Sequence, residues 1–189
     1  MNEKRLEKQV LRQFLTNRRS ELSPSFEKKN NIHIHIQPLI ENIKNVSVGT
    51  YMSFRNELNT KKLNEYLFKR DINLALPVID FKKKEISFFR FGHNTKLIKN
   101  NYSILEPENK NELIFPKIIL IPLLGYSLSG YRIGYGGGYY DKYLSKHSKS
   151  GLIKIGTAFT FQEVDQIPIE GHDQRLDWIL TEKHLYKVQ

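Results

Sequence analysis

The residues with the clearest chemical potential are the glycines and tyrosines of residues 130–141, which read GYRIGYGGGYYD. The continuous apolar run before them, KIILIPLL at 117–124, is typical of a strand buried on both faces. The residues after them, about 140–149, predict a helix. A glycine-rich turn between a strand and a helix N-terminus leaves backbone N–H groups open to phosphate oxygens, and Arg132 adds a guanidinium there.

Two familiar phosphate motifs do not describe this segment. A Walker loop requires GxxxxGK[ST], and no Lys-Ser or Lys-Thr comes directly after any of these glycines. The dinucleotide fingerprint GxGxxG fails because Tyr139 stands at its last position after Gly134 and Gly136. A flexible loop or tight turn is the simpler interpretation, and glycine- and tyrosine-rich stretches also bind single-stranded RNA by stacking. Phosphate binding, a plain turn and RNA binding all stay open on these residues alone.

The composition places this segment in a basic, cysteine-free chain of 189 residues, about the size of one domain. The formal net charge of +10 indicates an anionic partner, such as nucleic acid, a membrane surface or a phosphorylated small molecule. The absence of cysteine excludes disulfides, thiolate metal sites and a cysteine nucleophile. No apolar run approaches the roughly 18 residues of a membrane span, and the charged N-terminal residues lack a signal peptide's apolar stretch. We therefore expect a cytoplasmic protein.

The other hydrophobic patterns predict helices and strands that alternate. Apolar residues at helical spacing predict a helix over 4–19, Ser23-Pro24 marks a further helix start, and Thr60 caps a short helix. Strands are predicted at 46–54, 72–80, 86–91, 117–124, 152–159 and 176–180. This order predicts an α/β fold: a single domain with a largely parallel central sheet flanked by helices, and a ligand site at the carboxyl ends of the strands.

Residues 32–43 fit two patterns. Isoleucines alternate with His33 and His35, as in a strand, but a longer set of apolar residues has helical spacing. We prefer the helix, although Pro38 would strain its middle. The two histidines have no further ligands near them in the sequence, which argues against a metal site.

The segment GYRIGYGGGYYDKYL at 130–144 resembles the signature of the 5-formyltetrahydrofolate cyclo-ligase family, also called methenyltetrahydrofolate synthetase. Four further parts resemble the family in the same order. They are Lys8-x-x-Leu11-Arg12, YMSFRNELNT at 51–60, ILEP at 104–107 with ILIP at 119–122, and HDQRLDWILT at 172–181. Together they span nearly the whole chain, so the resemblance implies one cyclo-ligase domain over 1–189, acting as a monomer.

The resemblance implies an enzyme that closes 5-formyltetrahydrofolate to 5,10-methenyltetrahydrofolate while ATP is cleaved to ADP and phosphate. A formamide oxygen is a poor nucleophile and a poor leaving group. Phosphorylation turns it into an iminium phosphate, which the nitrogen at position 10 attacks as phosphate leaves. Such a site requires cations for the triphosphate, carboxylates for Mg²⁺ and a pocket for the pterin. The implied partners are these small molecules, not nucleic acid or a membrane.

The resemblance also implies roles for individual residues. It assigns ATP binding to Lys8, Arg12, Arg132, Ile133, Gly134, Tyr135, Gly136, Gly137, Gly138, Tyr139 and Tyr140. Folate binding falls to Met52, Glu57, Tyr135, Gly136, Gly137, Gly138 and Tyr139. Asp141 and Asp177 would be the magnesium carboxylates, and His172 would help to shape the site.

Each of these roles has a simpler structural alternative. Asp141 opens a predicted helix and would cap it, and Asp177 would be an ordinary residue at a strand edge. Lys8 and Arg12 lie four residues apart, on one helix face, which alone indicates a solvated basic surface. Without the resemblance, Glu57 would be a surface carboxylate and Met52 a core residue.

The alternative to an enzyme is an RNA- or nucleotide-binding protein that keeps the fold without the activity. Asp141 and Asp177 separate the two, because carboxylates beside an anion site repel a phosphate backbone. Three positions depart from the usual family pattern and concern the folate side. Ser127 ends a Gly-Tyr-Ser triplet where Ala-Phe-Asp is common, Val78 replaces an Arg, and Ile86 replaces a Met.

Overall fold

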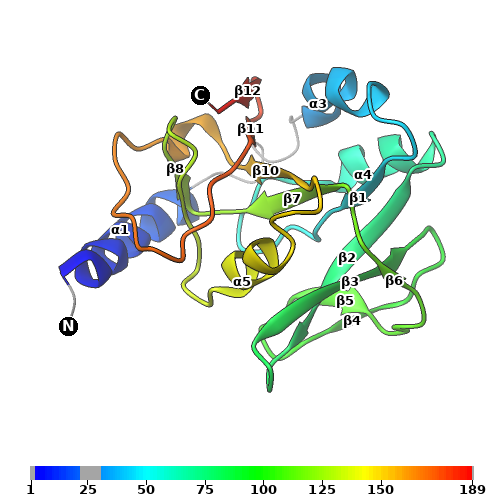
Figure 1. The fold of residues 1–189 in the computed structure, drawn as a ribbon, viewed down its shortest axis with the longest axis horizontal. Coiled ribbons are helices and arrows are strands. Elements are labelled where there is room, and N and C mark those ends of the chain that lie inside the picture. Colours follow the sequence, from blue (N-terminus) through cyan, green and yellow to red (C-terminus); the bar gives the residue numbers. More distant parts are fainter. Residues whose placement is uncertain (1–2, 22–30, 189) are drawn as a thin grey trace.

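The protein is described by a computed structural model over residues 3–21 and 31–188, and these residues form a layered α/β structure (Figure 1). Within them, eight strands form one sheet in the order β12-β11-β10-β7-β1-β2-β3-β6. The five strands from β11 to β2 are parallel, and antiparallel pairings attach β12, β3 and β6 at the edges. The strands are β1 (Ser47–Gly49), β2 (Asn73–Asp80), β3 (Glu85–Phe91), β6 (Leu113–Ile114), β7 (Ile118–Pro122), β10 (Ile153–Thr157), β11 (Trp178–Leu180) and β12 (Leu185–Lys187). The predicted fold class is confirmed.

Helices cover both faces of this sheet, and their packing explains the apolar run of β7. Ile118 and Leu120 pack with α3 (Ile32–Glu41) and α4 (Lys61–Phe68), whereas Ile119 and Ile121 pack with α5 (Tyr139–Lys146) on the other face. Side chains alternate along a strand, so a central strand between two helical layers needs apolar residues throughout. In the described part of the chain, no helix has the length and apolar composition to cross a membrane.

The remaining elements lie around one end of the sheet. Helix α1 (Glu3–Ser20) packs its Leu15 into a small apolar cluster with Leu124 and Ile133. Two short hairpins, β4 (Leu97–Lys99) with β5 (Leu105–Pro107) and β8 (Gly125–Tyr126) with β9 (Arg132–Ile133), stand outside the main sheet. A single 3₁₀ turn, η1 (Thr160–Gln162), follows β10. The hairpins were not predicted, because strands of two or three residues carry no readable periodicity.

The structure confirms the helix predicted after residue 31 and contradicts the cap predicted at Thr60. Residues 32–41 are helical, as preferred, with Pro38 inside the helix and Ile32, Ile36 and Ile40 buried. Thr60 does precede α4, but its hydroxyl donates to the Tyr51 carbonyl rather than capping the helix, so the predicted cap is wrong. The helix start predicted at Ser23-Pro24 lies outside the described residues.

The strand predicted over 46–54 is much shorter than expected. It ends at Gly49, and the chain then forms an irregular loop in which Arg55 and Asn56 have positive φ angles of 49° and 57°. Side-chain bonds replace the strand ladder in this loop, since the Tyr51 hydroxyl donates to the Leu58 carbonyl at 2.7 Å. The consequence is that Glu57 sits on a braced loop beyond the end of β1.

Phe88 tests the packing of the face that α5 covers. Its ring is fully buried, and a Cβ built on Gly49 would lie 2.8 Å from it. We expect Phe88→Ala to lower the free energy of unfolding by about 3–5 kcal/mol, measured by urea denaturation. Phe115→Ala is the matched control, because that side chain is 66% exposed and should change stability by less than about 0.5 kcal/mol. Equal losses in the two variants would contradict this description of the core.

Candidate active site

A pocket of about 450 Å³ opens at the carboxyl ends of β1, β2 and β7, where the fold predicted a ligand site. Tyr51 lies just beyond β1, Ile79 near the end of β2, and Pro122 at the end of β7. The glycine segment and the β4–β5 hairpin complete the walls. Every site residue predicted from the sequence except Asp177 lines this pocket.

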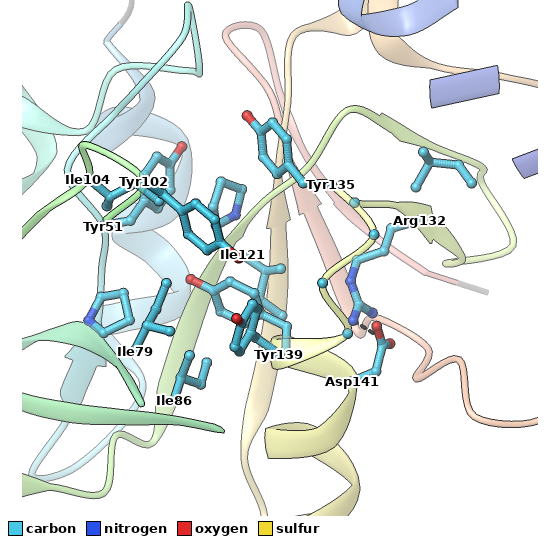
Figure 2. A pocket seen from close by; sticks show the side chains of 18 of the residues that line it. Tyr51, Ile79, Ile86, Tyr102, Ile104, Ile121, Arg132, Tyr135, Tyr139 and Asp141 are labelled. Carbon is cyan, nitrogen blue, oxygen red and sulfur yellow. Dashed lines mark hydrogen bonds and ion pairs between the residues drawn. The ribbon is translucent and has the colours of Figure 1, made fainter. Parts of the chain in front are cut away.

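The pocket has an apolar side and a charged side (Figure 2). Ile79, Ile86 and Ile121 gather on the first side with the rings of Tyr102 and Tyr139, while Arg132 and Asp141 face each other on the second. An apolar slot of this kind suits a flat ring system, and a charged end suits a polyanion. Ile86 is the one departure from the family pattern that lines the pocket. Val78 and Ser127 are buried elsewhere, and the Ser127 hydroxyl lies 2.8 Å from that of Ser129.

The glycine segment adopts a backbone that other residues would strain. Gly136 and Gly138 have φ angles of +92° and +67°, in the left-handed region. A Cβ on Gly137 would come within 2.6 Å of the Tyr139 ring. Gly138 is the residue directly before α5, so the free amides of that helix N-terminus open beside the pocket and favour an anion.

Two cations of helix α1, Lys8 and Arg12, line the pocket. The Lys8 ammonium, whose side chain is 4% exposed, lies 2.8 Å from Glu170 Oε2 and 2.5 Å from Asp173 Oδ2. Arg12 donates from Nε to the Gly134 carbonyl at 3.0 Å. A solvated basic surface therefore does not describe these residues. Burial alone would raise the pKa of Asp173, but the Glu170 amide and the Lys8 ammonium hold that pKa below its ordinary value.

Asp141 faces a buried cation rather than capping its helix. Its Oδ1 accepts a hydrogen bond from Arg132 at 2.6 Å and another from the Gln174 amide at 3.1 Å. Arg132 is only 6% exposed in its side chain and also donates to the Gln174 carbonyl. The N-cap position of α5 belongs to Gly138, so the capping alternative for Asp141 does not apply.

Asp177 lies elsewhere. It directly precedes β11 and therefore stands at the amino end of the parallel strands, whereas the pocket is at their carboxyl ends. Its Oδ2 accepts from the Lys154 amide at 2.8 Å, and its Oδ1 is 3.3 Å from the Lys154 ammonium. His172 does line the pocket, with an exposed side chain beside Asp173. His33 and His35 do not line it, and the described residues contain no group of three side chains suited to a metal ion.

Glu57 is a buried carboxylate held by two donors. Oε1 accepts from the Tyr135 hydroxyl at 2.6 Å, and Oε2 accepts from the Phe54 amide at 2.9 Å. Burial raises the pKa of Glu57 above its ordinary value, although both hydrogen bonds and the charges of Arg19 and Arg55 oppose the shift. Burial and the neighbouring Glu57 carboxylate also raise the pKa of Tyr135.

Several residues of the site were missed by sequence reasoning. Glu170 and Asp173 are the partners of Lys8, Tyr102 covers the apolar side, and Arg19 reaches Tyr135. A signal existed for Arg19, since it lies seven residues after Arg12 on the same face of α1. Asp173 also had a signal, since it follows His172 in the segment HDQRLDWILT. Glu170 and Tyr102 come from loops, and nothing in their local sequence indicates where those loops fold.

The sequence of this chain is similar to those of known proteins. A sequence model of the 5-formyltetrahydrofolate cyclo-ligase family matches residues 4–182. The chain belongs to this family. It is 32% identical over 152 residues to the 5-formyltetrahydrofolate cyclo-ligase of Haemophilus influenzae, covering 78% of this chain and 81% of that protein.

Solved structures agree with the assignment. The 5,10-methenyltetrahydrofolate synthetase of Aquifex aeolicus superposes with a TM-score of 0.75 at 26% identity, covering 96% of this chain and 93% of the other. The synthetase of Mycoplasma pneumoniae gives a TM-score of 0.68 at 26% identity, with 93% and 98% covered. This chain is therefore an enzyme of the cyclo-ligase class that acts in folate chemistry, and the pocket is its candidate active site.

Proposed function

We propose that this cyclo-ligase uses ATP and Mg²⁺ to convert 5-formyltetrahydrofolate to 5,10-methenyltetrahydrofolate through a phosphorylated formyl group. The observation that carries the proposal is a single pocket that joins an apolar slot to a glycine segment surrounded by three cations, Lys8, Arg12 and Arg132. The enzyme would act as one domain and a monomer in the cytoplasm, on small molecules. The carboxylates in the pocket, among them Asp141 and Asp173, disfavour an RNA backbone as the ligand.

The charged side supports ATP binding. Lys8 is paired with Glu170 and Asp173, and Arg132 with Asp141, so these cations are fixed in position. A triphosphate can replace the carboxylates as the partner of Lys8 and Arg132. The divalent cation that arrives with it would then pair with a carboxylate that has lost its partner. The amides at the start of α5 add neutral donors for phosphate oxygens.

The residues of the charged side also fit magnesium. Mg²⁺ prefers oxygen ligands and usually takes only one or two protein carboxylates, with phosphates and water completing its shell. Asp141 is such a carboxylate within the pocket, so we assign it to the metal. Asp177 remains a prediction from the family resemblance. When bound, the ion would neutralise charge on the phosphate groups during transfer.

The apolar side and the Glu57 loop support folate binding. The pterin amino and ring N–H groups are donors, and Glu57 offers them an acceptor at the pocket wall. Met52, Ile86 and Tyr139 would contact the ring faces. The formyl group would then lie against residues 135–139, near the γ-phosphate, which is why this segment is proposed to border both substrates.

The reaction follows in two displacements. The formyl oxygen attacks the γ-phosphorus, the bond from phosphorus to the bridging oxygen breaks, and ADP leaves. The nitrogen at position 10 then attacks the formyl carbon and loses its proton, while the carbon–oxygen bond breaks and phosphate departs. Lys8, Arg12 and Arg132 would orient the triphosphate and stabilise its developing charge, which is where most catalysis of phosphoryl transfer lies.

The direct test of the proposed function is a reconstitution. The purified enzyme is mixed with 5-formyltetrahydrofolate, ATP and MgCl₂, and formation of methenyltetrahydrofolate is followed by its absorbance while ADP is measured in parallel. We expect one ADP per product, and no product without ATP or with excess EDTA. Product formation at an unchanged rate without ATP would contradict the proposal.

Glu57→Gln tests the folate side. The amide keeps the shape but removes the charge, so the pterin loses a charge-assisted acceptor. We expect the KM for 5-formyltetrahydrofolate to rise by about ten- to a hundredfold with an unchanged KM for ATP, in steady-state assays. Glu65→Gln, an exposed residue of α4, is the control and should match the unmodified enzyme. An unchanged folate KM in Glu57→Gln would remove Glu57 from the folate site.

A further inference from the structure

Arg19 is a buried cation for which the reaction described above has no role. It is 2% exposed, near the C-terminal end of α1. One guanidinium nitrogen donates to the Tyr135 hydroxyl at 2.5 Å, and the other terminal nitrogen donates to the Leu123 carbonyl at 3.3 Å. The guanidinium carbon also lies 5.3 Å from the centre of the Tyr135 ring. A guanidinium buried to this degree requires a compensating negative charge nearby.

That charge is Glu57, reached through Tyr135. The Tyr135 hydroxyl accepts from Arg19 and donates to Glu57 Oε1 at 2.6 Å, so cation, phenol and carboxylate form a continuous chain. The chain joins three segments that are distant in sequence: α1, the glycine segment and the loop after β1. The loop is tied a second time, since the Asn56 amide donates to the Arg19 carbonyl at 3.3 Å.

Among the charges around Glu57, Arg19 is the cation with the strongest claim to stabilise its carboxylate. The charged and titratable groups acting on the carboxylate are Arg19, Arg55, Tyr51, Tyr135 and Tyr140. The three phenols are neutral near pH 7, because burial raises each of their pKa values further above the ordinary value. Arg55 is exposed and stacks on Phe54, where solvent screens its charge. Arg19 is therefore the buried positive charge in the described surroundings of Glu57.

We propose that Arg19 is a positioning residue of the folate site, which acts through the Tyr135 hydroxyl to hold Glu57 as an oriented carboxylate for the pterin. This inference rests on the proposed folate role of Glu57. Because the chain passes through Tyr135, it also fixes the glycine segment against α1 at the boundary between the two substrates. Arg19 itself is not among the residues that line the pocket.

The proposal predicts a particular pH dependence. A protonated Glu57 loses its acceptor character, so folate binding should fall as the pH drops through its pKa. Removal of Arg19 takes away a charge that lowers this pKa, so the fall should move to higher pH. A residue that only supports the fold would weaken binding at every pH without moving the midpoint.

The experiment measures the affinity for 5-formyltetrahydrofolate without ATP, by calorimetry across pH, for the full chain and four variants. We expect Arg19→Leu and Tyr135→Phe each to weaken binding by about ten- to a hundredfold near pH 7 and to raise the pH midpoint. Arg19→Lys, which keeps the charge, should restore most of the midpoint. Arg18→Leu is the matched control, since Arg18 is the exposed neighbour that lies over Phe161.

The outcomes are distinguishable. Affinity and midpoint in Arg19→Leu equal to those of the unmodified enzyme would overturn the role of Arg19, as would weaker binding with an unmoved midpoint. If Arg19→Leu does not fold by circular dichroism, Arg19→Gln takes its place, because the glutamine amide can still donate to the Tyr135 hydroxyl and only the charge is removed. No folate binding by the unmodified enzyme would overturn the proposed function itself, and this inference with it.

Discussion

Asp141→Asn is expected to lower kcat by about a hundred- to a thousandfold while the protein remains folded. The amide retains an oxygen that can accept from Arg132 and the Gln174 amide, the two contacts of Oδ1. It lacks the negative charge that a magnesium ligand supplies. The variant therefore separates the structural role of Asp141 from its proposed role in catalysis. Asp141→Ala would not separate them, because alanine leaves Arg132 buried without its partner.

The measurement is kcat over a range of MgCl₂ concentrations, with thermal unfolding in parallel. Asp165→Asn, on an exposed residue, is the control and should keep the original kcat. Asp177→Asn belongs in the same series. Because Asp177 lies at the amino end of the strands and outside the pocket, we expect activity near that of the control, which would restrict the metal role to Asp141. A loss as large as that of Asp141→Asn, with unchanged thermal unfolding, would instead support the role that the family resemblance implies for Asp177. A kcat near the original value in Asp141→Asn would rule Asp141 out as the metal ligand.

Lys8→Met has the second largest expected effect, a rise of about a hundredfold in the KM for ATP. Methionine preserves most of the apolar stem but removes the ammonium that the pocket holds between Glu170 and Asp173. Those carboxylates then face the triphosphate without a cation between them, so repulsion adds to the lost attraction. The KM for 5-formyltetrahydrofolate should change little, because the apolar side of the pocket is untouched.

Two further variants show that the effect belongs to the phosphate site. Lys4 lies one turn before Lys8 on α1, and its ammonium also reaches the segment 169–173, through the Ile169 carbonyl, but from an exposed position. Lys4→Met should therefore leave the KM for ATP unchanged. Lys8→Met combined with Asp173→Asn should recover stability without recovering ATP affinity. Equal KM values for ATP in Lys4→Met and Lys8→Met would contradict the assignment of Lys8.

The parts of the fold that the sequence predicted well have strong local patterns. Strand β7 is apolar on both faces because helices cover both, and the hairpin of β2 and β3 has a polar turn between two apolar runs. The glycine segment also has a strong local pattern. Gly136 and Gly138 have positive φ angles that favour glycine, so the backbone conformation is visible in the residue types.

The features that escaped prediction depend on contacts between distant residues. Lys8 meets Glu170 and Asp173 across separations of 162 and 165 residues, and no local pattern indicates such a pair. Thr60 has the right residue type for a helix cap, but a carbonyl brought close by the fold takes its hydroxyl. Asp177 occupies a motif shared with the family, yet the motif alone cannot say at which end of the sheet the residue lies.

The most direct test of the proposed reaction follows the formyl oxygen. 5-Formyltetrahydrofolate labelled with oxygen-18 in the formyl group is converted with ATP and MgCl₂, and the phosphate and water are analysed by mass spectrometry. If the pocket brings the formyl oxygen to the γ-phosphorus, the label appears in inorganic phosphate, one atom per product. Label recovered in water, with unlabelled phosphate, would contradict phosphorylation of the formyl group and the shared site on which it rests.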